Sequence, residues 1–185
     1  DMPLPQKVPI PIVPSKELIN LIQHDVMVAT APLTNIALSI LDNPNLTSVV
    51  KHLVIMGGSA YPEPVHGRLG NLQVDGSDDY AEYNFAVDPE AAQIVFSAGF
   101  EKITMIGLNV TRTVLYNHKI EKALIENGNA CSLRAAKILS SVGEEDLVDY
   151  ASVKEFDQDP VRALHDVVAM VCLDYPEIFA FEELP

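Results

Sequence analysis

Residues 81–92 read AEYNFAVDPEAA, and this stretch carries the strongest structural signal in the chain. Asp88 followed by Pro89 is typical of a helix start, because Asp caps the free N–H groups and Pro is preorganised for the first helical position. Gly99 is a common type of helix terminator. The stretch therefore predicts a helix over residues 88–98 that opens directly after a polar segment.

That polar segment contains a carboxylate, Glu82, and a carboxamide, Asn84, two positions apart. On an extended segment, residues at this spacing point to the same face, so both side chains are expected to reach one ligand. An acceptor beside a mixed donor and acceptor suits a polyol such as a sugar. The alternative is a polar loop that only leads into the helix.

Short apolar segments alternate with helical patterns along the rest of the chain. Near-continuous apolar strands separated by helices predict an α/β fold with an open, mostly parallel, Rossmann-like sheet flanked by helices. The length predicts one domain, or part of one. Strands are predicted at 25–30, 51–57 and 102–107, helices at 17–23, 33–41, 117–127, 130–141 and 159–173, and an extended proline-rich lead-in at 1–14.

In such sheets, ligands bind beyond the carboxyl ends of the strands. The residues there are Thr30, Met56 with the two glycines that follow it, and Asn109. Residues 59–80 form a long segment without periodicity, which predicts an active-site loop. The glycines at 57 and 58 either let the backbone approach a ligand or serve only the turn. The chain has neither GxGxxG nor GxxxxGK[ST], so nucleotide phosphate binding has little support.

The charge balance excludes more functions than it identifies. The net charge is −14, from 26 acidic and 12 basic residues, and such a field repels nucleic acids and anionic membrane surfaces. Two distant cysteines, Cys131 and Cys172, are expected to be reduced thiols, which favours the cytoplasm. No apolar run is long enough for a membrane span, and residues 1–14 do not resemble a signal peptide.

His165 and Asp166 interrupt the apolar sequence ALHDVVAMV. A buried carboxylate needs a partner or a metal, so this pair is either a structural dyad or part of a site. The Asp166 carboxylate and the Thr30 carbonyl are oxygen donors of the kind that calcium prefers, but calcium takes six to eight of them. Zinc is disfavoured, because no HxxxH, HExxH or paired-cysteine pattern is present.

Five motifs in order, ATAPLTNIAL, LVIMGG, AEYNFAVDPEAA, ITMIGLNVT and LHDVVAM, resemble those of the inosine-uridine preferring nucleoside hydrolases. The resemblance covers nearly the whole chain. It implies a Rossmann-like α/β fold and a Ca²⁺-dependent hydrolase that cleaves the N-glycosidic bond of ribonucleosides to give ribose and a free base. The transition state of such a reaction resembles an oxocarbenium ion. Assembly into a homodimer or homotetramer is also implied.

The resemblance also assigns roles to residues that match its motifs. Thr30, through its carbonyl, and Asp166 look like calcium ligands, and His165 looks like the acid that assists departure of the base. A second set looks like contacts to the sugar. This set consists of Met56 beneath the ribose, Asn84 at its hydroxyls, Glu82 at its 5′ end and, with stretched spacing, Asn71.

One feature of the family is missing from this chain. The Asp-x-Asp-x-Gly-x-Asp-Asp signature, which supplies most metal ligands and the general base in the family, does not occur here. The sequence is therefore expected to be a truncated hydrolase domain, or else a catalytically inactive relative that binds ribose or nucleoside or serves as an interaction module. A dinucleotide-binding domain is the least supported of the possibilities, because the glycine fingerprint is absent.

Overall fold

The computed structural model of the chain describes residues 25–64, 66–140 and 162–183. The proline-rich lead-in at 1–14 and the helix expected at 17–23 lie outside these residues. The described helices are α2 (Thr34–Asp42), α3 (Leu46–Val49), α4 (Tyr83–Ala86), α5 (Pro89–Ser97), α6 (Leu108–Thr111), α7 (His118–Asn127), α8 (Ala130–Ser140), α9 (His165–Asp174) and the 3-10 turn η2 (Pro176–Ile178). The strands are β1 (Val26–Ala29), β2 (His52–Met56), β3 (Leu72–Gln73), β4 (Tyr80–Ala81), β5 (Lys102–Ile106), β6 (Leu115–Tyr116) and β7 (Arg162–Ala163).

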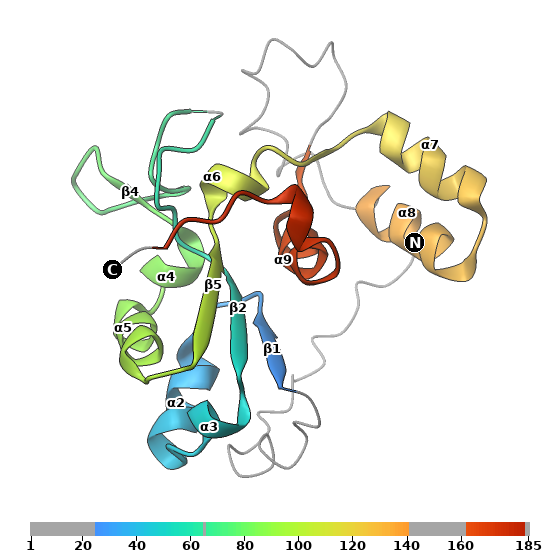
Figure 1. Cartoon of the computed structure of the whole chain (residues 1–185). Coiled ribbons are helices and arrows are strands. Elements are labelled where there is room, and N and C mark those ends of the chain that lie inside the picture. The colour runs from blue at the N-terminus through green and yellow to red at the C-terminus, as the bar shows by residue number, and fades with distance from the viewer. Residues whose placement is uncertain (1–24, 65, 141–161, 184–185) are drawn as a thin grey trace, which may run out of the picture.

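A parallel sheet of three strands, in the order β1-β2-β5, forms the centre of the fold (Figure 1). Its register pairs Val26 with His52 and His52 with Lys102, so the three strands begin level with one another. Their carboxyl ends consequently meet at one edge of the sheet. The parallel α/β architecture expected from the sequence is confirmed, and all three strands lie where the apolar segments predicted them.

The central strand β2 is buried on both faces because its apolar residues alternate between two cores. Leu53 and Ile55 pack with residues of α2 and α5, whereas Val54 and Met56 pack with residues of α9. Helices α2 and α5 thus cover one face of the sheet and α9 covers the other (Figure 1). A continuous apolar strand is the pattern required for a strand covered on both sides.

The last helix begins later than the sequence predicts. Instead of a helix over 159–173, Arg162–Ala163 forms strand β7, which pairs antiparallel with β6, and α9 starts at His165. The Asp-Pro signal at 159–160 lies outside the described residues. The correction places His165 and Asp166 in the first turn of α9 rather than in the middle of a helix.

The loop predicted at 59–80 has some regular structure of its own. Leu72–Gln73 pairs antiparallel with Tyr80–Ala81, which makes a short hairpin beyond the carboxyl end of the sheet. On another side of the fold, α7 and α8 pack on each other, and α7 buries none of its residues. Across the three described ranges, every helix is too short or too polar to cross a bilayer.

Candidate functional site

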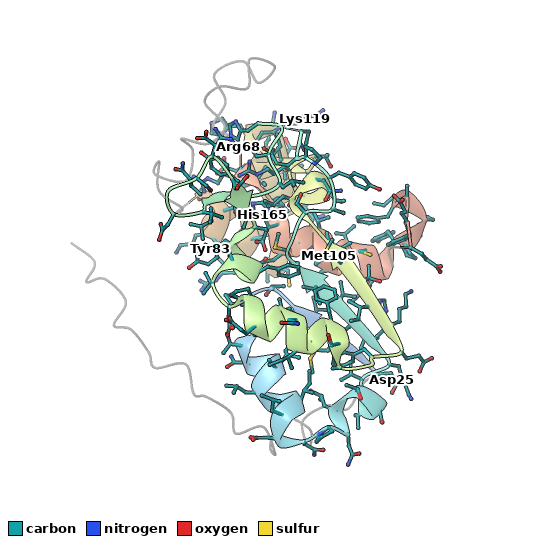
Figure 2. All side chains as sticks on the ribbon, turned by 90° about the vertical axis from the view of Figure 1, so that its left-hand side faces the viewer. Asp25, Arg68, Tyr83, Met105, Lys119 and His165 are labelled. Carbon is teal, nitrogen blue, oxygen red and sulfur yellow. The ribbon has the colours of Figure 1, made fainter. Side chains whose placement is uncertain are left out.

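A cavity of about 210 Å³ opens at the carboxyl edge of the sheet. It is formed by residues at or just after the ends of β1, β2 and β4, by Asn71 before β3, and by the first turn of α9. Figure 2 shows His165 and Tyr83 at this end of the molecule, away from Asp25 at the start of β1. The lining residues are Thr30, Met56, Asn71, Glu82, Tyr83, Asn84, His165 and Asp166.

Glu82 is held in place by three backbone N–H groups. Its Oε1 accepts from Asn84 N at 3.0 Å, and its Oε2 accepts from Gly58 N at 2.8 Å and Phe85 N at 3.2 Å. The side chain caps α4, and the residue is 5% exposed. A carboxylate offers about four acceptor positions, so roughly one remains for a ligand.

This geometry corrects the expectation of an extended segment. Glu82 itself is extended, but its carboxylate starts a helix, and Asn84 lies inside α4. The two side chains reach the same cavity because the chain turns around the cap and not because they share one face of a strand. A short helix is preferred here because the cap satisfies the first N–H groups of α4.

The two carboxamides are also oriented by the backbone. Asn84 Nδ2 donates to the Met56 carbonyl at 3.0 Å and contacts its Sδ at 3.5 Å. Asn71 Oδ1 accepts from Tyr83 N at 2.8 Å. Each amide therefore keeps its other polar atom for a ligand, an acceptor on Asn84 and a donor on Asn71.

The two glycines after β2 serve the turn and its packing. A Cβ at Gly57 would lie 2.5 Å from the Phe85 ring, and one at Gly58 would lie 2.7 Å from it. Gly58 also has a φ of 69°, which side chains rarely adopt. The sequence left open whether these glycines let the backbone approach a ligand or serve only the turn. The contacts with Phe85 support a role in the turn.

His165 is partly buried and bound to the end of α6. Its Nδ1 lies 2.7 Å from Thr111 Oγ1, and Thr111 is fully buried. Burial, with a further contribution from the Arg112 charge, lowers the pKa of His165 to about 4. The imidazole is therefore neutral near pH 7. A neutral ring still has one N–H to donate.

Asp166 follows in the first turn of α9, where burial raises the pKa of its carboxyl. The Asp166 carboxylate and the Thr30 carbonyl are hard oxygen donors, but they are two of the six to eight that calcium needs. Among the described residues, no group of three or more His, Cys, Asp and Glu side chains could hold a metal ion. These donors do not form a calcium site by themselves.

The family model described as inosine-uridine preferring nucleoside hydrolase matches residues 5–185. The chain belongs to this family. It is 30% identical over 159 residues to the inosine-uridine preferring nucleoside hydrolase of Leishmania major, covering 86% of this chain and 44% of that protein. It is 36% identical over 165 residues to the non-specific ribonucleoside hydrolase RihC of Salmonella newport (strain SL254), covering 89% of this chain and 46% of that protein.

Solved structures of nucleoside hydrolases share the fold. The purine-preferring ribonucleoside hydrolase from Gardnerella vaginalis aligns with a TM-score of 0.64 at 25% identity, over 90% of this chain and 48% of that one. The inosine-uridine preferring nucleoside hydrolase from Bacillus anthracis aligns with a TM-score of 0.63 at 22% identity, over 88% and 48%. The chain thus spans less than half the length of these relatives.

Four residues at or near the cavity were not identified from the sequence: Glu63, Tyr83, Thr111 and Arg112. Tyr83 lies between two residues that were identified, and its aromatic ring beside polar side chains was an available signal. Thr111 and Arg112 follow the third strand by a few residues, as ligand-binding segments do in such sheets. Glu63 had no comparable signal, because an acidic residue in a long polar loop usually belongs to the surface.

Proposed function

We propose that this chain provides the sugar-binding part of a nucleoside N-ribohydrolase, which uses water to split a ribonucleoside into ribose and a free base. The observation that carries the proposal is the convergence on one cavity of all seven residues to which the family resemblance assigns a role. They come from separate segments and meet at the carboxyl edge of the sheet. Membership of the nucleoside hydrolase family also supports the proposal.

The polar atoms of the cavity suit a pentose. The volume of about 210 Å³ is below the ~300–1,000 Å³ typical of sites for larger ligands, which favours the sugar over the whole nucleoside. Asn84 Oδ1 would accept from a ribose hydroxyl, Asn71 Nδ2 would donate to one, and the spare lone pair of Glu82 would accept another near the 5′ end. Met56 would pack beneath the ring.

In this proposal, the cavity assists cleavage mainly by electrostatics. The anomeric carbon gains positive charge as the glycosidic bond breaks, and the Glu82 carboxylate, buried among neutral N–H groups, stabilises that charge. His165, as a neutral imidazole, would donate a hydrogen bond to the departing base. The attacking water would supply its hydroxyl to the anomeric carbon and its proton to the base. The base would then leave toward the mouth of the cavity.

Calcium enters the proposal only as an ion that would bind ribose hydroxyls together with Thr30 and Asp166. When bound, such an ion supplies Lewis acidity and a water of lowered pKa. Because two donors do not complete its coordination, the roles assigned to this chain are binding the sugar and facing the base.

We also propose that the protein acts in the cytoplasm as a homodimer or homotetramer. Cys131 is exposed and Cys172 is buried, and both are free thiols, which is consistent with a reducing compartment. The acidic net charge supports a small-molecule substrate over nucleic acid. Sedimentation velocity checks the assembly state directly.

The experiment combines an assay with a binding measurement on the full chain. Release of ribose from inosine and from uridine is followed by a reducing-sugar assay, and ribose binding by calorimetry, each with and without Ca²⁺. Asn84→Ala is expected to weaken ribose binding up to about tenfold, because one hydrogen bond contributes roughly 1 kcal/mol. Asn45→Ala, an exposed position whose side chain caps nothing, is the control.

A second candidate function is binding without hydrolysis. It is supported by the finding that the described donors do not form a metal site. In that case the chain is a ribose-binding or nucleoside-binding module without hydrolysis. Ribose release that depends on Asn84 supports the hydrolase, whereas binding without release supports the module. Absence of both in a folded chain contradicts the two proposals together.

A further inference from the structure

Two consecutive residues at the end of α6 make two different buried contacts. Thr111 Oγ1 meets Nδ1 of His165 at 2.7 Å, and Arg112 Nη1 lies 3.2 Å from Glu63 Oε2. The Arg112 and Glu63 side chains are 3% and 0% exposed. One short segment therefore connects the candidate site to the loop after β2.

Glu63 is built into that loop through both its side chain and its backbone. Its Oε1 accepts from His66 N at 2.8 Å, its own N donates to the Arg68 carbonyl at 2.8 Å, and its carbonyl accepts from Gly67 N at 3.0 Å. The side chain of Arg68 in turn lies over the Tyr80 ring at 4.1 Å. The contacts of Glu63 thus hold together a compact turn in the segment that leads to Asn71.

We propose that the Glu63–Arg112 ion pair is a positioning device for His165. By fixing Arg112 at the end of α6, the pair holds the hydroxyl of the adjacent Thr111 against Nδ1 of the imidazole. In this proposal the Thr111 hydroxyl donates a hydrogen bond to Nδ1, which keeps the ring in the tautomer that carries hydrogen on Nε2. Nε2–H is then the donor presented to a ligand in the cavity, a role that rests on the proposed function.

The burial of the pair explains why it can act this way. A fully desolvated ion pair has few alternative arrangements, because either charge alone would be left without compensation. The same pair also fixes the loop that ends at Asn71, so the loop and His165 share one anchor. Glu63 and Arg112 line no part of the cavity, so both act through other residues.

The test measures the imidazole directly in the full 185-residue chain. Long-range ¹H–¹⁵N NMR reports the tautomer of His165, with its signal assigned by His165→Gln, and calorimetry reports the affinity for ribose. Wild type is expected to show one tautomer, with hydrogen on Nε2. Thr111→Val is expected to give a mixture of tautomers and ribose binding weaker by about two- to tenfold, because the tautomer with hydrogen on Nε2 is then only partly populated. Thr113→Val is the matched control, because the Thr113 hydroxyl donates to the Val110 carbonyl and, within the described ranges, has no contact with His165.

The decisive variant is Glu63→Leu/Arg112→Met, which replaces the pair by apolar side chains and is expected to fold. Mixed tautomers and weakened ribose binding in this folded variant support positioning. A wild-type imidazole signal with wild-type affinity overturns the proposal and leaves the pair a purely structural role. If the variant does not fold, Glu63→Asp decides, since it keeps both charges but withdraws the carboxylate by one methylene. An unchanged His165 signal in Glu63→Asp then overturns the proposal.

Failure of the proposed function gives a different result. If wild type binds no ribose and releases none from nucleosides, the sugar-binding role is contradicted. The imidazole signal of the same samples still decides whether the ion pair positions His165.

Discussion

Among the residues that the structure describes, two glutamates are buried beyond the carboxyl end of the sheet, and they are stabilised in different ways. Glu82 is bound by three backbone N–H groups, whereas Glu63 is paired with Arg112. Backbone amides carry no net charge, so the negative charge of Glu82 persists at the cavity, while that of Glu63 is balanced. Of these two glutamates, Glu82 is therefore the one arranged to stabilise a positive charge in the cavity. Glu63 serves instead to fix a loop.

The same substitution at both positions tests this comparison, and the larger effect is expected at Glu63. Glu63→Gln leaves the buried Arg112 without its counter-charge, which costs about 3–5 kcal/mol in the free energy of unfolding. Urea denaturation followed by circular dichroism measures the change. The control is Glu63→Leu/Arg112→Met, which removes both charges and is expected to recover most of the loss. A loss below about 1 kcal/mol for Glu63→Gln would mean that the pair is solvated as a surface pair would be.

The protonation of His165 provides a second test, because the charge of Arg112, the partner of Glu63, also acts on the imidazole. Burial and, to a smaller extent, Arg112 lower the pKa of His165 to about 4 in the folded state, against 6.5 when unfolded. The unfolded chain therefore binds more protons between these values, and stability falls as the pH is lowered from about 7 to 4. The shift corresponds to about 3 kcal/mol at 1.36 kcal/mol per pKa unit.

Urea denaturation across this pH range, in buffer with a chelator, measures the effect. His165→Gln is expected to remove that part of the pH dependence, and Arg112→Met is expected to raise the pKa of His165. Parallel pH profiles for wild type and His165→Gln would show that His165 titrates normally and is not buried in solution.

The sequence predicted the regions of this fold that are set by local signals. The helix after Asp88 was foreseen because its cap and its terminator are both encoded nearby, and α5 runs from Pro89 to Ser97. The strand β7 was not foreseen, since its pairing with β6 depends on residues distant in the chain. Glu82 was expected on an extended segment because spacing alone does not show which N–H groups a carboxylate will cap.

In the candidate site, too, residues in local motifs could be predicted and residues brought together by the fold could not. All lining residues except Asn71 belong to the five motifs, and the family resemblance located all of them except Tyr83. The Glu63–Arg112 pair belongs to no motif, and each partner resembles an ordinary surface charge until the fold brings the two together. The two side chains pair because the fold buries both of them, and no local sequence pattern indicates this burial.

At Glu82 the isosteric substitution is expected to have the smaller effect. Gln keeps one oxygen for Gly58 and Phe85 but turns an NH₂ group toward the N–H of Asn84, so one buried donor loses its acceptor. The expected loss is about 2 kcal/mol. Urea denaturation gives the total, and faster amide hydrogen exchange at Asn84 locates it. Glu90→Gln, at an exposed position in the first turn of α5, is the control and should change stability by less than about 0.5 kcal/mol. Equal losses for Glu63→Gln and Glu82→Gln would remove the distinction between the two burials.

The smallest expected effect concerns the turn that supplies one of the N–H groups to Glu82. Gly58 and Gly99 both have positive φ, at 69° and 84°, so alanine is strained at either position. A Cβ at Gly58 would also meet the Phe85 ring at 2.7 Å and Met105 Sδ at 2.9 Å, whereas one at Gly99 would meet nothing within 4 Å. Gly58→Ala is therefore expected to cost about 1 kcal/mol more than Gly99→Ala, because overpacking adds to the backbone strain. Thermal denaturation of the two variants measures the difference. Equal losses would mean that Phe85 moves aside freely, and the Gly58 N–H would then be a less rigid donor to Glu82 than the contacts indicate.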